Sequence, residues 1–326
     1  MSVRDDVLLF LEKNKGQSVS GEELAKTLYV SRNAVWKAVK ALQADGYPIT
    51  AVTNRGYCLA RESEIFSAQS VLRELGAAGE DFHIETADSL TSTNTVLKER
   101  AAKGAPEGTV LIAARQTAGK GRQGRQFSSP EGTGLYMSIL LRPTMQAQEA
   151  LFLTTAAAVA VSASVEEVSG RKTGIKWVND VWIDGLKICG ILTEASFDLE
   201  GGGLEYAVVG IGVNLTEPKG GFPEELRGVA GAVFSLGEDT IGAKSRLAAG
   251  ILRRFWEYYR ALPQRVFWEE YCRRSVVVGR EITILGTDPQ PARAIGIDEE
   301  CRLRVRLPDG SERLLSSGEV SVRPKL

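Results

Sequence analysis

The chain has 326 residues, of which 43% are hydrophobic and 25% charged, and this composition excludes a disordered or fibrous protein. The 40 Lys and Arg residues against 41 Asp and Glu residues give a formal net charge of −1. Any nucleic-acid site must therefore be a local basic patch. The length corresponds to roughly two domains at ~150 residues each. Four scattered cysteines without a CxxC pair, and a single histidine, His83, exclude a structural zinc site and indicate a reducing compartment.

The sequence predicts neither export nor a membrane span. Asp5 and Asp6 lie where a signal peptide would be basic and then apolar. The longest uncharged run, residues 150–165, is shorter than a bilayer span. We therefore expect a cytoplasmic protein without membrane contact.

The first segment, to about residue 62, has the pattern of a winged helix-turn-helix. An apolar helical stripe opens the chain, and Ser20 followed by Glu23 predicts a capping box at the start of a second helix. Ser31 predicts the N-cap of a third helix. The turn-forming residues 53–56, between two short apolar runs, predict a hairpin directly after that helix.

Residues 66–275 have a mixed α/β pattern. Helices are predicted at 68–75, 92–103, 145–168, 243–262 and 265–273, and strands at 109–114, 134–141, 174–178, 181–184, 187–197 and 204–215. Asp184-Gly185 is a tight hairpin turn between two of these strands. We therefore expect an antiparallel or mixed sheet rather than a doubly wound parallel one.

The last residues, 276–326, alternate in short β runs around a turn at Asp309-Gly310, a pattern typical of a small β-barrel. The predicted fold class is α+β multidomain. It comprises a winged helix-turn-helix at 1–62, a central mixed-sheet α/β domain at 66–275 and a C-terminal small β-barrel at 276–326.

The first candidate site is the glycine-rich segment QTAGKGRQGR at 116–125. Its glycines fit G-x-G-x-x-G, but Pro130 and Gly132 prevent the helix that a dinucleotide fingerprint requires, and a Walker Gly-Lys-Ser/Thr is absent. Residues 108–130 contain four basic residues and no acidic one. This pattern favours a loop that binds phosphate or carboxylate over a solvated basic loop.

Three further polar segments are candidates. Polar residues of KWVND at 176–180 lie in apolar surroundings, where they are costly unless paired, although a solvated turn is the alternative. Residues 92–94, Ser-Thr-Asn, favour a helix N-cap. The two glycines of GIGVN at 210–214 indicate close approach of a ligand or another backbone.

The third helix of the first segment carries candidate DNA contacts. Residues 24–44 contain four basic residues and no acidic one, as expected of a recognition helix that meets bases and phosphates. Use of the winged helix for protein contacts is the alternative. The candidates are Ser31, Arg32, Asn33, Trp36, Lys37, Lys40 and, in the hairpin, Arg55.

Together these motifs resemble one family, the bifunctional biotin protein ligases and biotin operon repressors. The resemblance runs along nearly the whole chain, through the winged helix, DSLTSTN, QTAGKGRQGR…SSPEGTGLYMS, KWVNDVWIDGLKICGIL, GIGVN and the terminal β module. It implies that biotin and MgATP form biotinyl-5′-AMP and pyrophosphate, and that a lysine of a biotin carrier protein then accepts the biotin as an amide. No enzyme nucleophile is needed, which agrees with a chain that has one histidine.

The resemblance also implies residue roles. Biotin would be bound by Ser92, Thr93, Asn94, Gln116, Lys120, Gly121, Arg122 and Lys187. The ATP and adenylate side would be lined by Arg122, Arg125, Lys176, Asn179, Asp180 and Asn214. Lys187 and Arg122 would be catalytic, because cations remove the repulsion between two anionic reactants. Mg²⁺ would arrive with ATP rather than occupy a fixed protein site.

The implied partners are a biotin carrier protein, either an acetyl-CoA carboxylase subunit or that of another biotin-dependent carboxylase, and operator DNA. One chain supplies one reading helix, so a palindromic operator requires a homodimer. The resemblance implies that biotinyl-AMP favours this dimer.

Three positions depart from the family pattern: Lys120 replaces an arginine, Phe127 a tryptophan and Val178 a proline. Lysine keeps the charge of arginine but loses its bidentate fork. Two rival functions are a lipoate ligase, which would lack the winged helix and this basic loop, and a biotin-sensing transcription factor without ligase activity. The basic residues retained at every expected position argue against the second.

Overall fold

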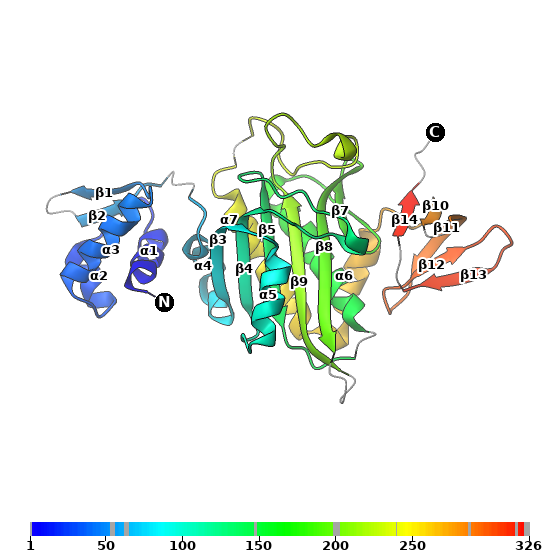
Figure 1. Cartoon of the computed structure of the whole chain (residues 1–326), viewed down its shortest axis with the longest axis horizontal. Helices are drawn as coiled ribbons and strands as arrows, with labels where there is room; N and C mark the ends of the chain where they lie inside the picture. The colour runs from blue at the N-terminus through cyan, green and yellow to red at the C-terminus, as the bar shows by residue number, and fades with distance from the viewer. Residues whose placement is uncertain are drawn as a thin grey trace. The chain divides into compact units, whose positions relative to one another are not determined.

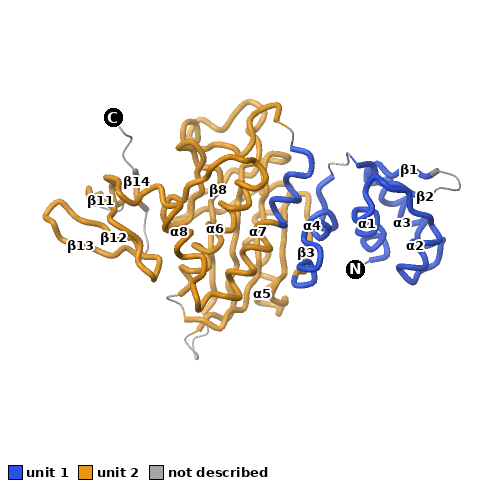
Figure 2. The backbone as a smooth tube through the Cα atoms, turned by 180° about the vertical axis from the view of Figure 1, so that it is seen from behind, with its two compact units in different colours: residues 1–81, 239–249 blue, residues 82–238, 250–326 orange. Residues whose placement is uncertain are grey.

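The computed structural model describes residues 2–52, 56–61, 65–146, 149–197, 203–238, 240–285, 288–316 and 319–322. The chain divides into two compact units (Figure 2). One comprises Met1–Asp81 and Asp239–Ala249, and the other Phe82–Glu238 and Gly250–Leu326. Each unit is described by itself.

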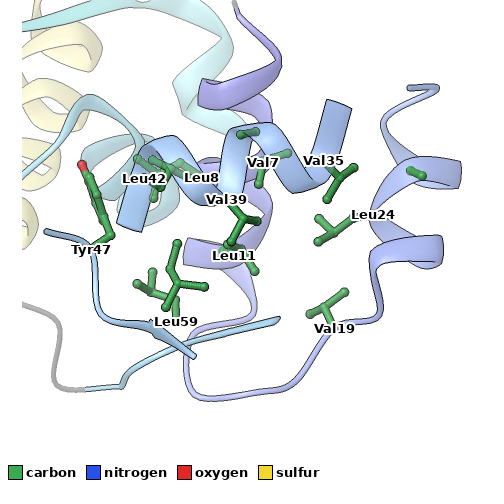
Figure 3. Close-up of a cluster of buried hydrophobic side chains, with 13 residues drawn as sticks. Val7, Leu8, Leu11, Val19, Leu24, Val35, Val39, Leu42, Tyr47 and Leu59 are labelled. Atoms are coloured by element: carbon green, nitrogen blue, oxygen red, sulfur yellow. The ribbon is translucent and has the colours of Figure 1, made fainter. Parts of the chain in front are cut away.

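The first unit contains the predicted winged helix. Its elements are α1 (Val3–Lys13), α2 (Gly21–Thr27), α3 (Arg32–Ala44) and the antiparallel strands β1 (Ile49–Val52) and β2 (Gly56–Leu59) (Figure 1). Leu11, Leu24, Val35 and Leu59 belong to one buried apolar cluster to which all three helices and the hairpin contribute (Figure 3). The helices and the hairpin therefore share a core of their own.

Serine hydroxyls begin α2 and α3 as predicted. Ser20 accepts a hydrogen bond from the backbone N–H of Glu23 at 3.0 Å, and Ser31 accepts one from Ala34 at 3.1 Å. Within the described hydrogen bonds of α2, Glu23 returns no side-chain bond to Ser20, so the predicted capping box is only half formed. Both caps still satisfy an amide that the helix leaves unpaired.

Beyond the winged helix, the first unit contains α4 (Ala68–Leu75), the 3₁₀ turn η1 (Gly76–Asp81) and the start of α7 (Ala243–Arg260). The Glu12 carboxylate of α1 is buried and lies 2.7 Å from the guanidinium of Arg73 in α4. The hydroxyls of Ser70 and Ser245 lie 2.8 Å apart. These contacts join α4 to α1 and to α7.

The second unit is built on a seven-stranded mixed sheet of order β3-β4-β5-β9-β8-β7-β6. The strands are β3 (His83–Leu90), β4 (Thr109–Gln116), β5 (Gly134–Leu141), β6 (Gly174–Lys176), β7 (Asp180–Ile183), β8 (Leu186–Phe197) and β9 (Leu204–Asn214). β3 pairs parallel to β4, and the other described pairings in this sheet are antiparallel. The predicted mixed sheet is confirmed, and β3 is a strand that the sequence pattern does not predict.

Helices cover both faces of this sheet. α5 (Thr93–Ala102) lies on one face, and α6 (Ala150–Ser169) lies on the other with α8 (Trp268–Arg273) packed against it (Figures 1 and 2). Among the described residues, α6 alone is long and apolar enough to cross a bilayer; it corresponds to the helix predicted at 145–168 and extends past the uncharged run of 150–165. Because Phe152–Val165 is buried almost without interruption, α6 is a core helix of this unit.

The C-terminal part of the second unit is a five-stranded antiparallel sheet of order β13-β12-β11-β10-β14. The strands are β10 (Glu281–Leu285), β11 (Gln290–Ile297), β12 (Leu303–Arg306), β13 (Glu312–Leu315) and β14 (Glu319–Val322). The small C-terminal β module is confirmed, and its described strands form one antiparallel sheet with β13 and β14 at the edges where the sequence predicts a small β-barrel. Contacts from its β11–β12 turn to the main sheet bear on the site and are described below.

Candidate active site

A cavity of about 310 Å³ opens in the second unit. It is lined by the start of α5, the basic loop after β4, the β6–β7 turn and strands β8 and β9, together with Leu285, Val320 and Ser321 of the C-terminal sheet. Every residue predicted to bind biotin or the nucleotide lines it: Ser92, Thr93, Asn94, Gln116, Lys120, Gly121, Arg122, Arg125, Lys176, Asn179, Asp180, Lys187 and Asn214. Segments far apart in sequence therefore converge on one cavity.

Asn94 is fixed by hydrogen bonds on both ends of its amide. Its Oδ1 accepts from the Ser138 hydroxyl at 2.6 Å, and its Nδ2 donates to Leu192 O at 3.1 Å and to Glu194 Oε2 at 2.9 Å. Asn94 therefore has little capacity left for a direct polar contact with a ligand. It orders the cavity wall instead.

The N-cap interpretation of residues 92–94 holds for the position of Ser92 but not for the hydrogen bonds of the three residues. Ser92 occupies the N-cap position of α5 but makes no side-chain cap hydrogen bond. Thr93 is buried, and its backbone N–H donates to Gln116 Oε1 at 2.9 Å. Gln116 Nε2 in turn donates to Ser129 Oγ at 2.8 Å. These polar residues connect α5 to the end of β4.

The two glycines of GIGVN make room for side chains. A Cβ on Gly210 would lie 2.1 Å from Asn94 Oδ1, and a Cβ on Gly212 would lie 2.6 Å from the ring of Phe127. Both glycines lie on β9, two residues apart, and so face the same side of the sheet. Both glycines are approached closely, as predicted, but by the side chains of Asn94 and Phe127 rather than by a ligand or another backbone.

The basic loop is a compact turn and not the start of a helix. Gly121 N–H donates to Arg125 O at 2.7 Å and Phe127 N–H donates to Gly119 O at 2.9 Å, around the three-residue 3₁₀ turn η2 (Arg122–Gly124). Gly119 has no room for a side chain, since its Cβ would lie 2.4 Å from Phe127 O. Rejection of the dinucleotide fingerprint is therefore confirmed.

Two cations of the cavity are held by consecutive residues of the β6–β7 turn and β7. Arg122 Nη1 donates to Asn179 Oδ1 at 3.0 Å, and Lys187 Nζ lies 2.7 Å from Asp180 Oδ1. Asn179 is itself fixed, because its Nδ2 donates to Ile191 O at 2.9 Å. KWVND is thus a paired polar segment, and the solvated-turn alternative is wrong.

Lys176 and Asn214 contact other parts of the same unit. Lys176 packs over the Trp182 ring, with its Nζ 5.1 Å from the ring centroid. Asn214 Nδ2 donates to Gly231 O at 3.1 Å, and Lys187 pairs through its backbone with Ala230. Val229 and Ala230, next to these contacts, also line the cavity.

The cavity is strongly cationic. Its described lining holds five cationic side chains, Lys120, Arg122, Arg125, Lys176 and Lys187, and Asp180 as its one carboxylate. Burial raises the pKa of the Cys189 thiol, which also lines the cavity, far above its ordinary value. That thiol is protonated at neutral pH, so it cannot act as a thiolate nucleophile.

Ser138 and Glu194 are residues that sequence reasoning missed. Burial alone would raise the pKa of Glu194, but hydrogen bonds from Lys98 and Asn94 outweigh it and hold that pKa below its ordinary value. The Glu194 carboxylate is therefore ionised and holds Asn94 in place. Ser138 lies in the apolar strand β5. A polar residue within such an apolar run is the one sequence signal that could have identified it.

The recognition-helix candidates are exposed as predicted. Arg32, Asn33, Trp36, Lys37 and Lys40 lie on the open face of α3, opposite its buried residues. Ser31 is exposed but also serves as the N-cap. Arg55 lies outside the described residues.

Metal-ligating residues do not cluster within the described part of the chain. There, no group of three or more His, Cys, Asp and Glu side chains is arranged to hold an ion. His83 is exposed at the start of β3 and does not line the cavity.

Family models match three parts of the chain. Residues 86–214 match the Biotin/lipoate A/B protein ligase family, residues 3–58 an HTH domain, and residues 277–323 the Biotin protein ligase C terminal domain. The fold and the cavity thus define a protein ligase of the biotin/lipoate type with a DNA-binding domain before it.

Individual relatives sharpen this assignment. Bifunctional ligase/repressor BirA of Bacillus subtilis is 33% identical over 321 residues, covering 97% of this chain and 98% of the relative. Biotin--[acetyl-CoA-carboxylase] ligase of Mycobacterium tuberculosis is 33% identical over 240 residues, covering 70% and 85%. A solved structure of biotin protein ligase from Aquifex aeolicus in complex with biotin and ATP has a TM-score of 0.62 at 28% identity, covering 74% of this chain and 99% of that one. The chain belongs to the BirA family of bifunctional ligase/repressors.

Proposed function

We propose that this protein is an ATP-dependent biotin protein ligase that also represses transcription in response to biotin. The observation that carries the enzymatic part is the cavity with five cationic side chains and one carboxylate. Such a cavity suits the meeting of biotin's carboxylate with the triphosphate of ATP, because cations offset the repulsion between two anions. The products of the first step are biotinyl-5′-AMP and pyrophosphate.

Each side of the cavity has a role in this proposal. Thr93, Gln116 and the rest of the polar wall hold biotin, together with Ser92, Lys120 and Gly121. Lys187 and Arg122 contact the reacting carboxylate and α-phosphate, while Asn179 and Asp180 keep these two cations in place. Arg125, Lys176 and Asn214 lie on the nucleotide side. Most of the rate enhancement of biotinyl-AMP formation then comes from positioning the two reactants and from stabilising their charge.

Mg²⁺ fits this site as a companion of ATP. Mg²⁺ is usually bound by substrate phosphates and one or two carboxylates, and Asp180 is the carboxylate that the described lining provides. When bound, the ion would supply further neutralisation of phosphate charge. The chain's own residues bind and orient the two anions.

In the second step, a lysine of a biotin carrier protein takes the biotin. The amine attacks the biotinyl carbonyl, an amide forms, and AMP leaves. The acceptor is a carrier subunit of acetyl-CoA carboxylase or of another biotin-dependent carboxylase. Cytoplasmic location belongs to this proposal, and the four cysteines, all free in the structure, agree with a reducing compartment.

The repressor part rests on the exposed face of α3. A winged helix with one such face per chain reads a palindromic operator as a homodimer.

We place the domain limits at 1–62, 66–275 and 276–326 within this proposal. If biotinyl-AMP favours the dimer, dimerisation must tighten biotinyl-AMP binding by the same factor.

Parallel adenylation assays test the enzymatic part. The protein is incubated with ATP labelled in its α-phosphate and with biotin or lipoate, and the acyl-adenylate is separated from ATP. We expect an adenylate with biotin and none with lipoate. An adenylate with lipoate alone would identify a lipoate ligase, and none with either would identify a transcription factor without ligase activity.

Sedimentation of the full-length protein tests the regulatory part. We expect a monomer without ligand and a dimer with biotinyl-AMP at micromolar concentration, together with DNA binding that depends on biotin. A monomer under both conditions, or DNA binding indifferent to biotin, would contradict the proposed switch.

A further inference from the structure

We propose that Trp177 and Tyr271 are positioning residues through which α8 and the C-terminal module set the placement of Arg122 and Lys187. This inference rests on the proposed function and adds to it how the two cations are held. It concerns the four consecutive residues 177–180. The first two are hydrogen-bonded to the C-terminal module and to α8, and the last two hold the cations.

The segment that leads into the C-terminal module pairs with the edge of the main sheet. Ile175 N–H donates to Arg274 O at 2.7 Å, and Val276 N–H donates to Ile175 O at 3.0 Å. A Cβ on Gly174 would lie 2.1 Å from the side chain of Val276, so glycine permits this approach. The strand before the turn is thus tied to the chain that follows α8.

Trp177 reaches the C-terminal module directly. Its indole is 3% exposed, and its Nε1–H donates to Cys301 O at 3.0 Å. Cys301 lies in the β11–β12 turn. That turn is held in place by Trp268, whose Nε1–H donates to Asp298 O at 2.7 Å, and by an ion pair between Arg265 and Glu300 at 2.9 Å. The carbonyl oxygen of Cys301, which accepts the hydrogen bond from Trp177, is therefore held in place.

Tyr271 holds the next residue. It is fully buried in α8, and its hydroxyl donates to Val178 O at 3.0 Å. Its position is further set by α8, where Arg274 forms ion pairs with Glu166 at 2.7 Å and with Glu270 at 2.6 Å. Both hydrogen bonds to residues 177 and 178 are buried, where water cannot replace them.

Trp177 lines the cavity together with Asn179 and Asp180, and these last two hold its cations. Asn179 accepts from Arg122 and Asp180 pairs with Lys187. Loss of the hydrogen bond from Trp177 or from Tyr271 would shift the turn, and both cations would move with it. Since a misplacement of ~1 Å can cost roughly 10²-fold in rate, a partial shift is expected to slow adenylation severalfold to tenfold.

A pre-steady-state assay separates positioning from folding. Biotinyl-AMP formation is followed in a rapid burst, with biotin and ATP saturating for each variant. The burst amplitude counts the competent sites, and its rate constant reports the chemistry. Tyr271→Phe and Trp177→Phe are expected to keep an amplitude of one per chain while the rate constant falls about tenfold.

Tyr259→Phe is the matched control, because the Tyr259 hydroxyl, which is half-buried, is also hydrogen-bonded, but to Glu107 and away from the cavity. It should keep the wild-type rate constant. In an Asn179→Ala background, Tyr271→Phe should still slow the burst through Asp180 and Lys187, but by a smaller factor than in the wild type, since the link from the turn to Arg122 is already broken.

The outcomes are distinct. A lower amplitude with a wild-type rate constant would mean that Trp177 and Tyr271 only stabilise the fold, and would overturn the inference. Additive effects of Asn179→Ala and Tyr271→Phe would also overturn the route through Asn179. A wild-type chain without any burst would refute the proposed function, and this inference with it.

Discussion

Substitution of Gly210 by alanine is expected to weaken biotin binding through Asn94. The added Cβ would lie 2.1 Å from Asn94 Oδ1, whereas ordinary contacts begin at 3.4 Å. Asn94 must withdraw, and it would lose hydrogen bonds of 2.6, 2.9 and 3.1 Å to Ser138, Glu194 and Leu192. At about 0.5–1.5 kcal/mol for each bond, the loss is about 1.5–4.5 kcal/mol in total.

Isothermal titration with biotin and thermal unfolding measure this loss. The free energy of unfolding should fall by about this amount, and biotin should bind more weakly because the displaced Asn94 disrupts the cavity wall. The matched control is Gly296→Ala on β11, where a Cβ would have no neighbour within 4 Å and φ is not in the left-handed region. It should leave biotin affinity unchanged.

A double substitution identifies the cause. In Gly210→Ala/Asn94→Ala the clash is gone, so its unfolding temperature should equal that of Asn94→Ala alone. Wild-type biotin affinity and unfolding temperature for Gly210→Ala would refute the reasoning, because the strand would then have accommodated the methyl group without moving Asn94.

Three further predictions follow from the site and its supports. Lys187→Ala should slow biotinyl-AMP formation by roughly 10²–10³-fold with unchanged unfolding, and a wild-type rate would remove Lys187 from the mechanism. Arg122→Ala should weaken biotin and biotinyl-AMP binding; in the wild type, biotinyl-AMP should slow proteolysis within residues 119–126, and equal cleavage with and without it would contradict ordering of the loop. The Arg274 hydrogen bond lowers the pKa of Glu166 to about 2, so its stabilisation is present above the ordinary pKa of ~4.3 and is lost as pH falls toward 2. The urea midpoint of Glu166→Gln should therefore lie below the wild type at pH 7, with a gap that narrows by pH 3; a constant gap would contradict the linkage.

Local chemistry allowed the winged helix and the hairpins to be predicted from sequence. Ser20 and Ser31 mark helix starts because short-range capping depends on neighbouring residues. Asp184 and Gly185 both have positive φ, at 49° and 82°, as their turn type requires. β3 was missed because it is an edge strand whose residues are mostly exposed without regular alternation, so it lacks the period-two signal.

The residues of the site were predicted by resemblance, whereas their partners were not. Asn94 meets Glu194 across 100 positions and Ser138 across 44, and such pairs depend on sheet order rather than on local pattern. The tertiary hydrogen bonds of Thr93 and Asn94 were missed for the same reason. A cap and a buried network use the same residue types, and only the tertiary partners distinguish them.

The burial of α6 has a consequence for how the protein is made. Strands β6 to β9 and helices α7 and α8, which pack on it, follow it in the chain. At about 5–20 residues per second, the ribosome needs on the order of 5–20 s to add the ~100 residues between α6 and α8. During that interval this apolar helix lacks its native cover, so the nascent chain is expected to need a holding chaperone until α8 has emerged.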